Sequence, residues 1–221
     1  MNESRAVLVN RIIVLSKVLK LSYTEFIEKF FNEINVDLNN VIINPDNSID
    51  VNQDVDLSHL ELEEIPMKFN IIKGNFACSH NQLTSLKGCP KVVFGSFKCN
   101  NNYLTDLVLG PEIVTGFYNC DLNELISLNG APSQVSSFYC SFNKLTNLVG
   151  SPSKVTTYYV CCNNRLTSIT GSPASVSLFD CSNNLLNDFN KSLDEVDYLI
   201  AQNNPLANLN YLPEIRISLE I

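Results

Sequence analysis

The chain has 221 residues, of which 45 % are hydrophobic, and it carries a formal net charge of −8. This hydrophobic content indicates a globular chain, and the length is enough for a sizeable buried core. The acidic balance argues against general nucleic-acid binding, which depends on clustered Lys and Arg. The 30 Asn residues exceed ordinary usage. Because Asn favours neither helices nor ordinary strands, the chain is expected to use it repeatedly for one structural purpose.

Residues 1–54 are predicted to form an N-terminal unit of two helices and a β-hairpin. Residues 5–20 form an apolar helical segment, and the apolar residues from Tyr23 to Ile34 recur at helical spacing behind a Ser22–Glu25 capping box. Two short apolar runs then flank a turn sequence at 44–47, which predicts the hairpin. We expect this unit to cap a solenoid, and a helical pair that also binds a partner is the alternative.

Residues 1–54 also bear on the cellular location of the protein. They lack the unbroken apolar stretch of an export signal, and the chain contains no uncharged run long enough to span a membrane. We therefore expect a cytoplasmic protein with reduced thiols and without membrane contact.

Residues 55–221 repeat a unit of 20–21 residues. Each unit places an aromatic residue two before a Cys, an Asn three after it and a Leu five after it, and most units place a Pro twelve after it. The same frame extends back to Leu57 and forward to Ala201, which makes about eight turns. The Cys residues that define the frame are Cys78, Cys99, Cys120, Cys140, Cys161 and Cys181.

This pattern resembles the leucine-rich repeat, L-x-x-L-x-L-x-x-N-x-L, with the aromatic residue and the Cys in place of two Leu residues. The short unit is also similar to repeats in bacterial effectors and in hypothetical proteins of large bacteriophages. The resemblance implies a solenoid with a parallel β-sheet on its concave face and little helix on its convex side. For a phage-encoded protein it also implies the host cell cytoplasm.

Strand geometry supports the same fold independently of the resemblance. Residues two apart in a strand point to the same side, so the aromatic and Cys columns are expected to stack in one core. Each Asn stands where a strand ends. We expect its amide to bond backbone groups of its own turn and of the next turn.

The Cys column is predicted to consist of buried core thiols, because spacings of 20 and 21 differ from the close pairs of a zinc site. Cys162 is expected to face outward and Cys89 to lie in a turn, so both are candidate reactive thiols. His59 and His80 occupy equivalent positions on adjacent turns and are expected to be surface residues. The sequence shows no phosphate loop, nucleophile elbow or dinucleotide fingerprint, so no cofactor, metal or enzymatic activity is expected.

The outward strand positions lie three before, one before and one after each Cys. In leucine-rich repeat proteins these positions bind partners. Here they are small and polar in the early turns and apolar or aromatic in the later ones. Such a surface is typical of protein interfaces, although strands favour Tyr, Val and Ile regardless of function. The predicted partner-binding residues are Phe117, Tyr139, Tyr158, Val160, Leu178, Tyr198 and Ile200.

These observations predict a non-catalytic module that captures a partner protein on its concave face. The phage likeness implies an inhibitor or modulator of a host defence or regulatory protein. The alternatives are a structural or assembly component, and an enzyme that acts through Cys162 or the N-terminal segment. A further hypothesis is a homodimer through the strand edge at 217–221.

Overall fold

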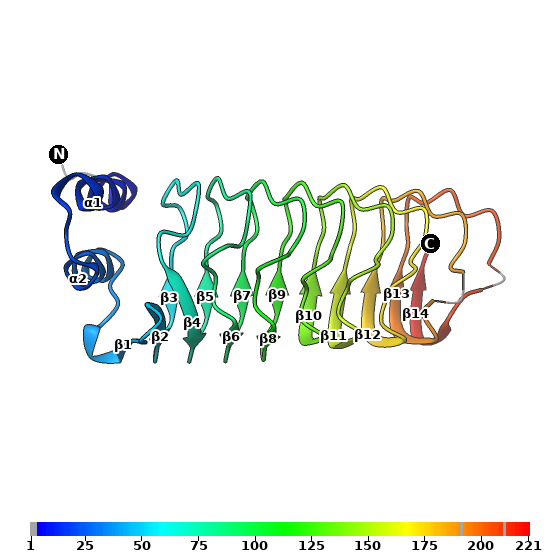
Figure 1. The fold of residues 1–221 in the computed structure, drawn as a ribbon. Helices are drawn as coiled ribbons and strands as arrows, with labels where there is room; N and C mark the ends of the chain where they lie inside the picture. Colours follow the sequence, from blue (N-terminus) through cyan, green and yellow to red (C-terminus); the bar gives the residue numbers. More distant parts are fainter. Residues whose placement is uncertain (1–3, 191, 210) are drawn as a thin grey trace.

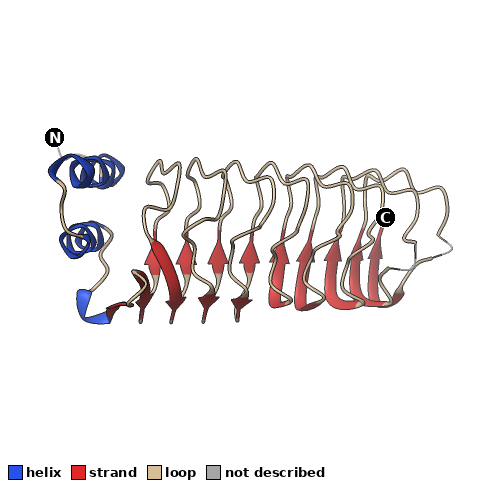
Figure 2. Cartoon of the chain, viewed as in Figure 1, coloured by secondary structure: helices blue, strands red, loops and turns tan. Residues whose placement is uncertain are grey.

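The computed structural model describes residues 4–190, 192–209 and 211–221 as a parallel β-solenoid of about nine turns. The turns stand side by side in a row, and two helices lie at the N-terminal end of the row (Figure 1). Figure 2 shows that the turns of the solenoid consist of short strands joined by loops. The prediction of a solenoid with little helix is confirmed.

Both predicted helices are present at the N-terminal end. Helix α1 spans Arg5–Leu19, and the hydroxyl of Ser4 accepts a hydrogen bond from a backbone N–H of its first turn. Helix α2 spans Tyr23–Glu33 and begins with the predicted capping box, in which Ser22 and Glu25 bond each other's backbone N–H. The apolar stripe of α2 is buried at Phe26, Ile27, Phe30 and Phe31.

The hairpin that follows is continuous with the solenoid. A short 3₁₀ helix, η1 (Leu38–Asn40), precedes strand β1 (Val41–Ile43), which pairs antiparallel with β2 (Ser48–Val51). Strand β2 also pairs in parallel with β4 (Lys68–Ile72), so it belongs to a sheet of the solenoid as well as to the hairpin. The rings of Phe31 and Phe69 lie 6.2 Å apart and join the helical core to the solenoid core.

The solenoid contains two sheets. A nine-stranded sheet takes one strand from each turn, and all its strands run parallel. Its strands are β3 (Val55–Asp56), β5 (Phe76–Ala77), β7 (Phe97–Lys98), β9 (Tyr118–Asn119), β10 (Gln134–Tyr139), β11 (Lys154–Val160), β12 (Ser175–Asp180), β13 (Glu195–Ile200) and β14 (Glu214–Glu220). The smaller sheet has the order β1-β2-β4-β6-β8, with β6 at Val92–Val93 and β8 at Ile113–Val114.

The early and late turns differ in strand length. In the early turns a glycine lies between a strand of the smaller sheet and the next strand of the large sheet, at Gly74, Gly95 and Gly116. A Cβ atom on Gly95 would lie 2.5 Å from the carbonyl oxygen of Gly74, so adjacent turns approach too closely there for a side chain. From Ser136 onward the equivalent residues carry side chains, and the two short strands merge into one of six or seven residues.

The core consists of the two predicted columns. The six Cys residues of the frame are all 0 % exposed, and aromatic rings of successive turns pack on one another beside them. For example, the rings of Phe76 and Phe97 lie parallel with centroids 5.8 Å apart. The prediction that like residues stack on like residues in one core is confirmed.

The Asn residues form a ladder of side-chain hydrogen bonds along the same core. The amide nitrogen of Asn123 donates to the carbonyl oxygens of Cys120 and Cys99, each at 3.1 Å, and its Oδ1 accepts from the N–H of Leu104. Asn81, Asn102, Asn143, Asn164, Asn184 and Asn204 repeat this arrangement.

The predicted role of Asn is confirmed for its own turn, but the second turn that it bonds is the preceding one, not the next. The backbone direction explains this difference. The N–H and C=O groups of one strand residue point the same way, and the N–H of Cys99 points to Asn119 of the following turn. The carbonyl of Cys99 therefore accepts a hydrogen bond from Asn123, which belongs to that following turn.

Candidate functional site

The predicted partner-binding residues lie on the outward side of the nine-stranded sheet. The strand register aligns Tyr158 with Leu178, and Leu178 with Tyr198, on three neighbouring strands. The side chains of Tyr158 and Tyr198 are 44 % and 42 % exposed, while Leu178 is half-buried between them. These three residues form a continuous apolar ladder across β11, β12 and β13.

A second column runs beside this ladder. The register aligns Tyr139 with Val160, Val160 with Asp180, and Asp180 with Ile200. The carboxylate of Asp180 therefore interrupts the column, and it accepts hydrogen bonds from the N–H and hydroxyl of Ser182 at 2.9 and 2.6 Å.

Phe117 extends the surface toward the early turns. Its ring meets that of Tyr139 edge to face, with centroids 6.0 Å apart. On the other side, the ammonium of Lys98 lies 5.5 Å from the centre of the Phe117 ring. The structure thus brings all seven predicted residues onto one surface, called the apolar face below: Phe117, Tyr139, Tyr158, Val160, Leu178, Tyr198 and Ile200.

The column one after each Cys is polar and internally bonded. The N–H of Ser141 donates to the carboxylate of Asp121 at 2.6 Å, and the thiol of Cys162 lies 3.2 Å from the Ser141 hydroxyl. Burial raises the pKa of Asp121 to about 6, against the lowering effect of the hydrogen bonds from Ser141 and Asn119. A carboxylate beside the apolar face thus ionises close to neutral pH.

The two candidate thiols differ in accessibility. Cys162 is half-buried, as expected for an outward residue. Cys89 lies at a turn, as predicted, with its N–H bonded to the carbonyl of Leu86 at 3.0 Å, but it is only 6 % exposed, which argues against its role as a reactive thiol. Burial raises the pKa of the Cys89 thiol, and it does the same for Cys99 and Cys120 in the column, which opposes formation of a reactive thiolate.

The two histidines stack on adjacent turns, as their spacing predicts. The rings of His59 and His80 are nearly parallel with centroids 4.2 Å apart, and the amide nitrogen of Asn101 lies 2.7 Å from Nδ1 of His80. Across the residues that the structure describes, no group of three or more His, Cys, Asp or Glu side chains is placed to hold a metal ion.

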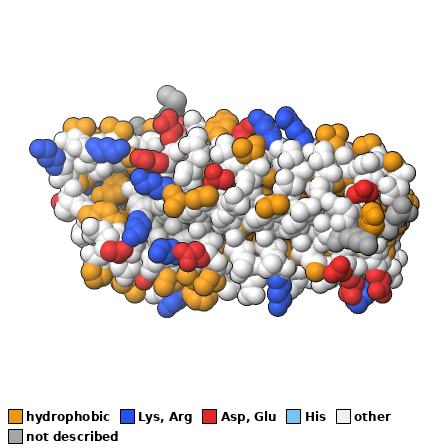
Figure 3. Space-filling view, turned by 45° about the vertical axis from the view of Figure 1, so that its right-hand side comes forward, with side chains coloured by type: hydrophobic (Ala, Val, Ile, Leu, Met, Phe, Trp, Pro, Cys, Tyr) orange, Lys and Arg blue, Asp and Glu red, His pale blue; other side chains and the backbone are white. Residues whose placement is uncertain are grey.

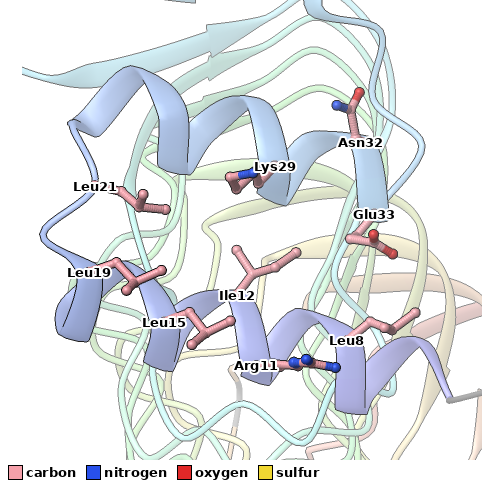
Figure 4. A pocket seen from close by; sticks show the side chains of 9 residues that line it. All are labelled: Leu8, Arg11, Ile12, Leu15, Leu19, Leu21, Lys29, Asn32 and Glu33. Carbon is pink, nitrogen blue, oxygen red and sulfur yellow. The ribbon is translucent and has the colours of Figure 1, made fainter.

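A separate hollow of about 440 Å³ lies between α1 and α2. Figure 4 shows Leu8, Ile12, Leu15 and Leu19 of α1 along one side of it, and Lys29 of α2 on the other. Its lining is mostly aliphatic, so it could take an apolar side chain. It is remote from the apolar face, because the helices stand at the opposite end of the row from β11–β13 (Figure 1).

Sequence reasoning missed two residues beside the apolar face. Leu122 and Phe142 are 47 % and 52 % exposed and have positive φ angles of 55° and 54°. Each stands two after a frame Cys, the position that His80 and Asn101 hold in earlier turns. A signal was available in the sequence, because His or Asn occupies this position in the other turns and Leu122 and Phe142 break that series. Asn and His tolerate the left-handed conformation, which apolar side chains rarely adopt.

Charged residues make up 17 % of the chain. Figure 3 shows that uncharged side chains and backbone make up most of the face it displays. None of the helices within the described ranges is both long and apolar enough to cross a membrane. Comparison with protein-family models, with curated proteins and with solved structures finds no match for this chain.

Proposed function

We propose that this chain is a leucine-rich repeat protein that binds another protein through the apolar face and has no catalytic role. The observation that carries the proposal is the ladder of Tyr158, Leu178 and Tyr198, which the strand register makes continuous. Large Tyr side chains that are rigidly held and partly exposed are favoured anchors of protein interfaces.

The charge of the outward columns favours a protein over a nucleic acid as the partner. Between Asn75 and Gln202 these columns contain one cation, Lys98, and two carboxylates, Asp121 and Asp180. Phosphate binding depends on several Lys or Arg side chains. The short repeat unit supports a phage-encoded protein that acts on a host protein in the host cytoplasm, by resemblance alone.

The N-terminal helices are proposed to cap the solenoid. The guanidinium of Arg5 donates to the carbonyl of Asp56 at 2.7 Å, and the amide of Asn10 donates to the carbonyl of Leu60 at 2.9 Å. These side chains bond backbone groups of the first turn that would otherwise meet solvent. Terminal caps of this kind protect the ends of repeat arrays.

Self-association is a second candidate, because strand β14 lies at the edge of the nine-stranded sheet. Ile217 in this strand and Ile221 directly after it are 62 % and 56 % exposed. Exposed edge strands pair readily with other chains. Light scattering at rising protein concentration tests this candidate: a dimer supports it, and a mass that stays monomeric contradicts it.

Peptide display tests the proposed protein-binding function. Twelve-residue random peptides are selected on the wild-type chain, and their affinity is then measured for the Tyr158→Ala/Tyr198→Ala double variant. We expect the affinity to fall at least tenfold, since buried Tyr anchors dominate interface energies. Phe94→Ala is the matched control, because Phe94 is 55 % exposed but follows β6 of the smaller sheet.

Two results would contradict the proposal. One is a library that yields no binder. The other is a set of binders that keep their affinity for the double variant while circular dichroism shows an intact fold.

A further inference from the structure

Eight of the turns end their strand with one residue in the left-handed conformation. This residue stands two after the frame Cys or its equivalent, and its φ lies between 53° and 59° in all eight turns. The position is therefore a requirement of the solenoid and not an accident of one turn. The residues are His59, His80, Asn101, Leu122, Phe142, Asn163, Asn183 and Asn203.

Six of these eight residues are of a type that tolerates the conformation. Asn and His are enriched several-fold among residues with positive φ, whereas bulky apolar side chains clash with their own backbone there. Leu122 and Phe142, on consecutive turns, are the exceptions. Each is expected to shift the folding equilibrium toward the unfolded chain by about tenfold relative to Asn.

Burial within the chain does not offset this strain. Both side chains are about half exposed, at 47 % for Leu122 and 52 % for Phe142. Their backbones are held in place by bonds to the next turn. The N–H of Leu122 donates to the backbone carbonyl of Ser141, and the N–H of Phe142 donates to the backbone carbonyl of Cys162. Strained residues that expose apolar groups are candidates for a contact outside the chain.

The location of the two residues identifies that contact. Leu122 follows Asp121 and Phe142 follows Ser141, both of which belong to the outward columns. They occupy the turns whose strands carry Phe117 and Tyr139 at the near end of the apolar face. Leu122 and Phe142 together are called the strand-end rim below.

We propose that the strand-end rim contacts the same protein partner, which continues from the apolar face over the ends of β9 and β10. This inference rests on the proposed function. The partner segment presents apolar side chains together with Lys or Arg. The carboxylate of Asp121 adjoins the rim, and Lys98, the single cation of the outward columns, already lies over Phe117.

The test uses the full chain and the same peptides selected from the twelve-residue random library. Leu122→Asn and Phe142→Asn are each expected to raise the urea midpoint of unfolding, because Asn relieves the strain. Both variants are also expected to bind the selected peptides at least tenfold more weakly than the wild-type chain does. The selected peptides should be enriched in Lys or Arg beside aromatic or aliphatic residues.

Val149→Asn is the matched control. Val149 lies in the same turn as Phe142 and is 54 % exposed, but its φ is not positive. It lies seven residues beyond Phe142, past the strand-end rim. The control variant is expected to keep wild-type affinity.

The outcomes separate this inference from the proposed function. A lower urea midpoint in the Asn variants would show that the two side chains stabilise the fold, and it would overturn the inference. Unchanged peptide affinity would overturn it as well. If Tyr158→Ala/Tyr198→Ala abolishes binding while the rim variants do not affect it, the proposed function stands and the inference fails. If neither set of variants affects binding, both fail.

Discussion

Asp121 is expected to reduce the stability of the protein at neutral pH, and the Asp121→Asn variant isolates the effect. The side chain is half-buried, and desolvation of its charged form raises its pKa from 3.8 to about 6. Asparagine keeps an oxygen that can accept the hydrogen bond from the N–H of Ser141. The equivalent residue of the preceding turn is already an Asn, Asn100, so the substitution suits the local backbone.

The size and sign of the effect follow from the two pKa values. The folded chain holds the proton of Asp121 more tightly than the unfolded chain does, so stability falls as pH rises from about 4 to about 6. A difference of about two pKa units corresponds to about 3 kcal/mol at most. Because the side chain is still partly in contact with solvent, we expect about 1–2 kcal/mol.

Urea unfolding of both proteins between pH 4 and pH 7.5, followed by circular dichroism, measures the difference directly. The stability of Asp121→Asn relative to wild type should grow by about 1–2 kcal/mol across this range. Carboxylates elsewhere are present in both proteins, and their contributions cancel. A difference that stays constant with pH, or that grows toward acid, would refute the reasoning.

Asp54 provides a control of opposite sign. Its pKa is lowered by hydrogen bonds from the N–H and the side-chain amide of Asn75, at 2.7 and 3.1 Å. Its ionised form therefore stabilises the fold at neutral pH, and this stability is lost as pH falls below about 4. Asp54→Asn should accordingly be less stable than wild type at pH 7, with a gap that narrows only in acid.

Three further predictions concern the packing of the solenoid, and urea unfolding measures each of them. Asn143→Leu should destabilise the fold by about 3 kcal/mol or more, because it leaves the carbonyls of Cys120 and Cys140 without their amide donor. A loss below about 1 kcal/mol would contradict the stabilising role of the Asn hydrogen bonds. Gly95→Ala should cost about 2 kcal/mol, since the new Cβ would lie 2.5 Å from a carbonyl oxygen of the adjacent turn. Tyr118→Phe should stabilise by about 1 kcal/mol, because among the described residues the buried hydroxyl has no nitrogen or oxygen partner and the neighbouring thiol of Cys99 is only a weak one. A loss of stability would contradict this expectation.

Much of the fold was predictable from the sequence because the same pattern of 20–21 residues recurs along most of the chain. A strand places residues two apart on the same side, so the aromatic residue and the Cys of each unit had to face one core. The capping box of Ser22 and Glu25 and the stripe of α2 were equally readable, because they depend on residues three or four apart. The membership of the apolar face followed from the same alternation.

Other features depend on contacts between turns, and the period alone could not reveal them. The close approach at Gly95, the burial of Cys89 and the bonding of each Asn to the preceding turn are set by how one turn lies against the next. The half-burial of Asp121, which shifts its pKa, has the same origin.

The sequence by itself thus determined the solenoid, its core columns and the residues of the apolar face, because these follow from spacing along the chain. Only the tertiary structure decided how far each side chain is exposed, with Tyr158 and Tyr198 exposed on either side of the half-buried Leu178. It also decided the backbone conformation that strains Leu122 and Phe142. Exposure and left-handed geometry both depend on the packing of neighbouring turns, which the residues of one turn do not encode.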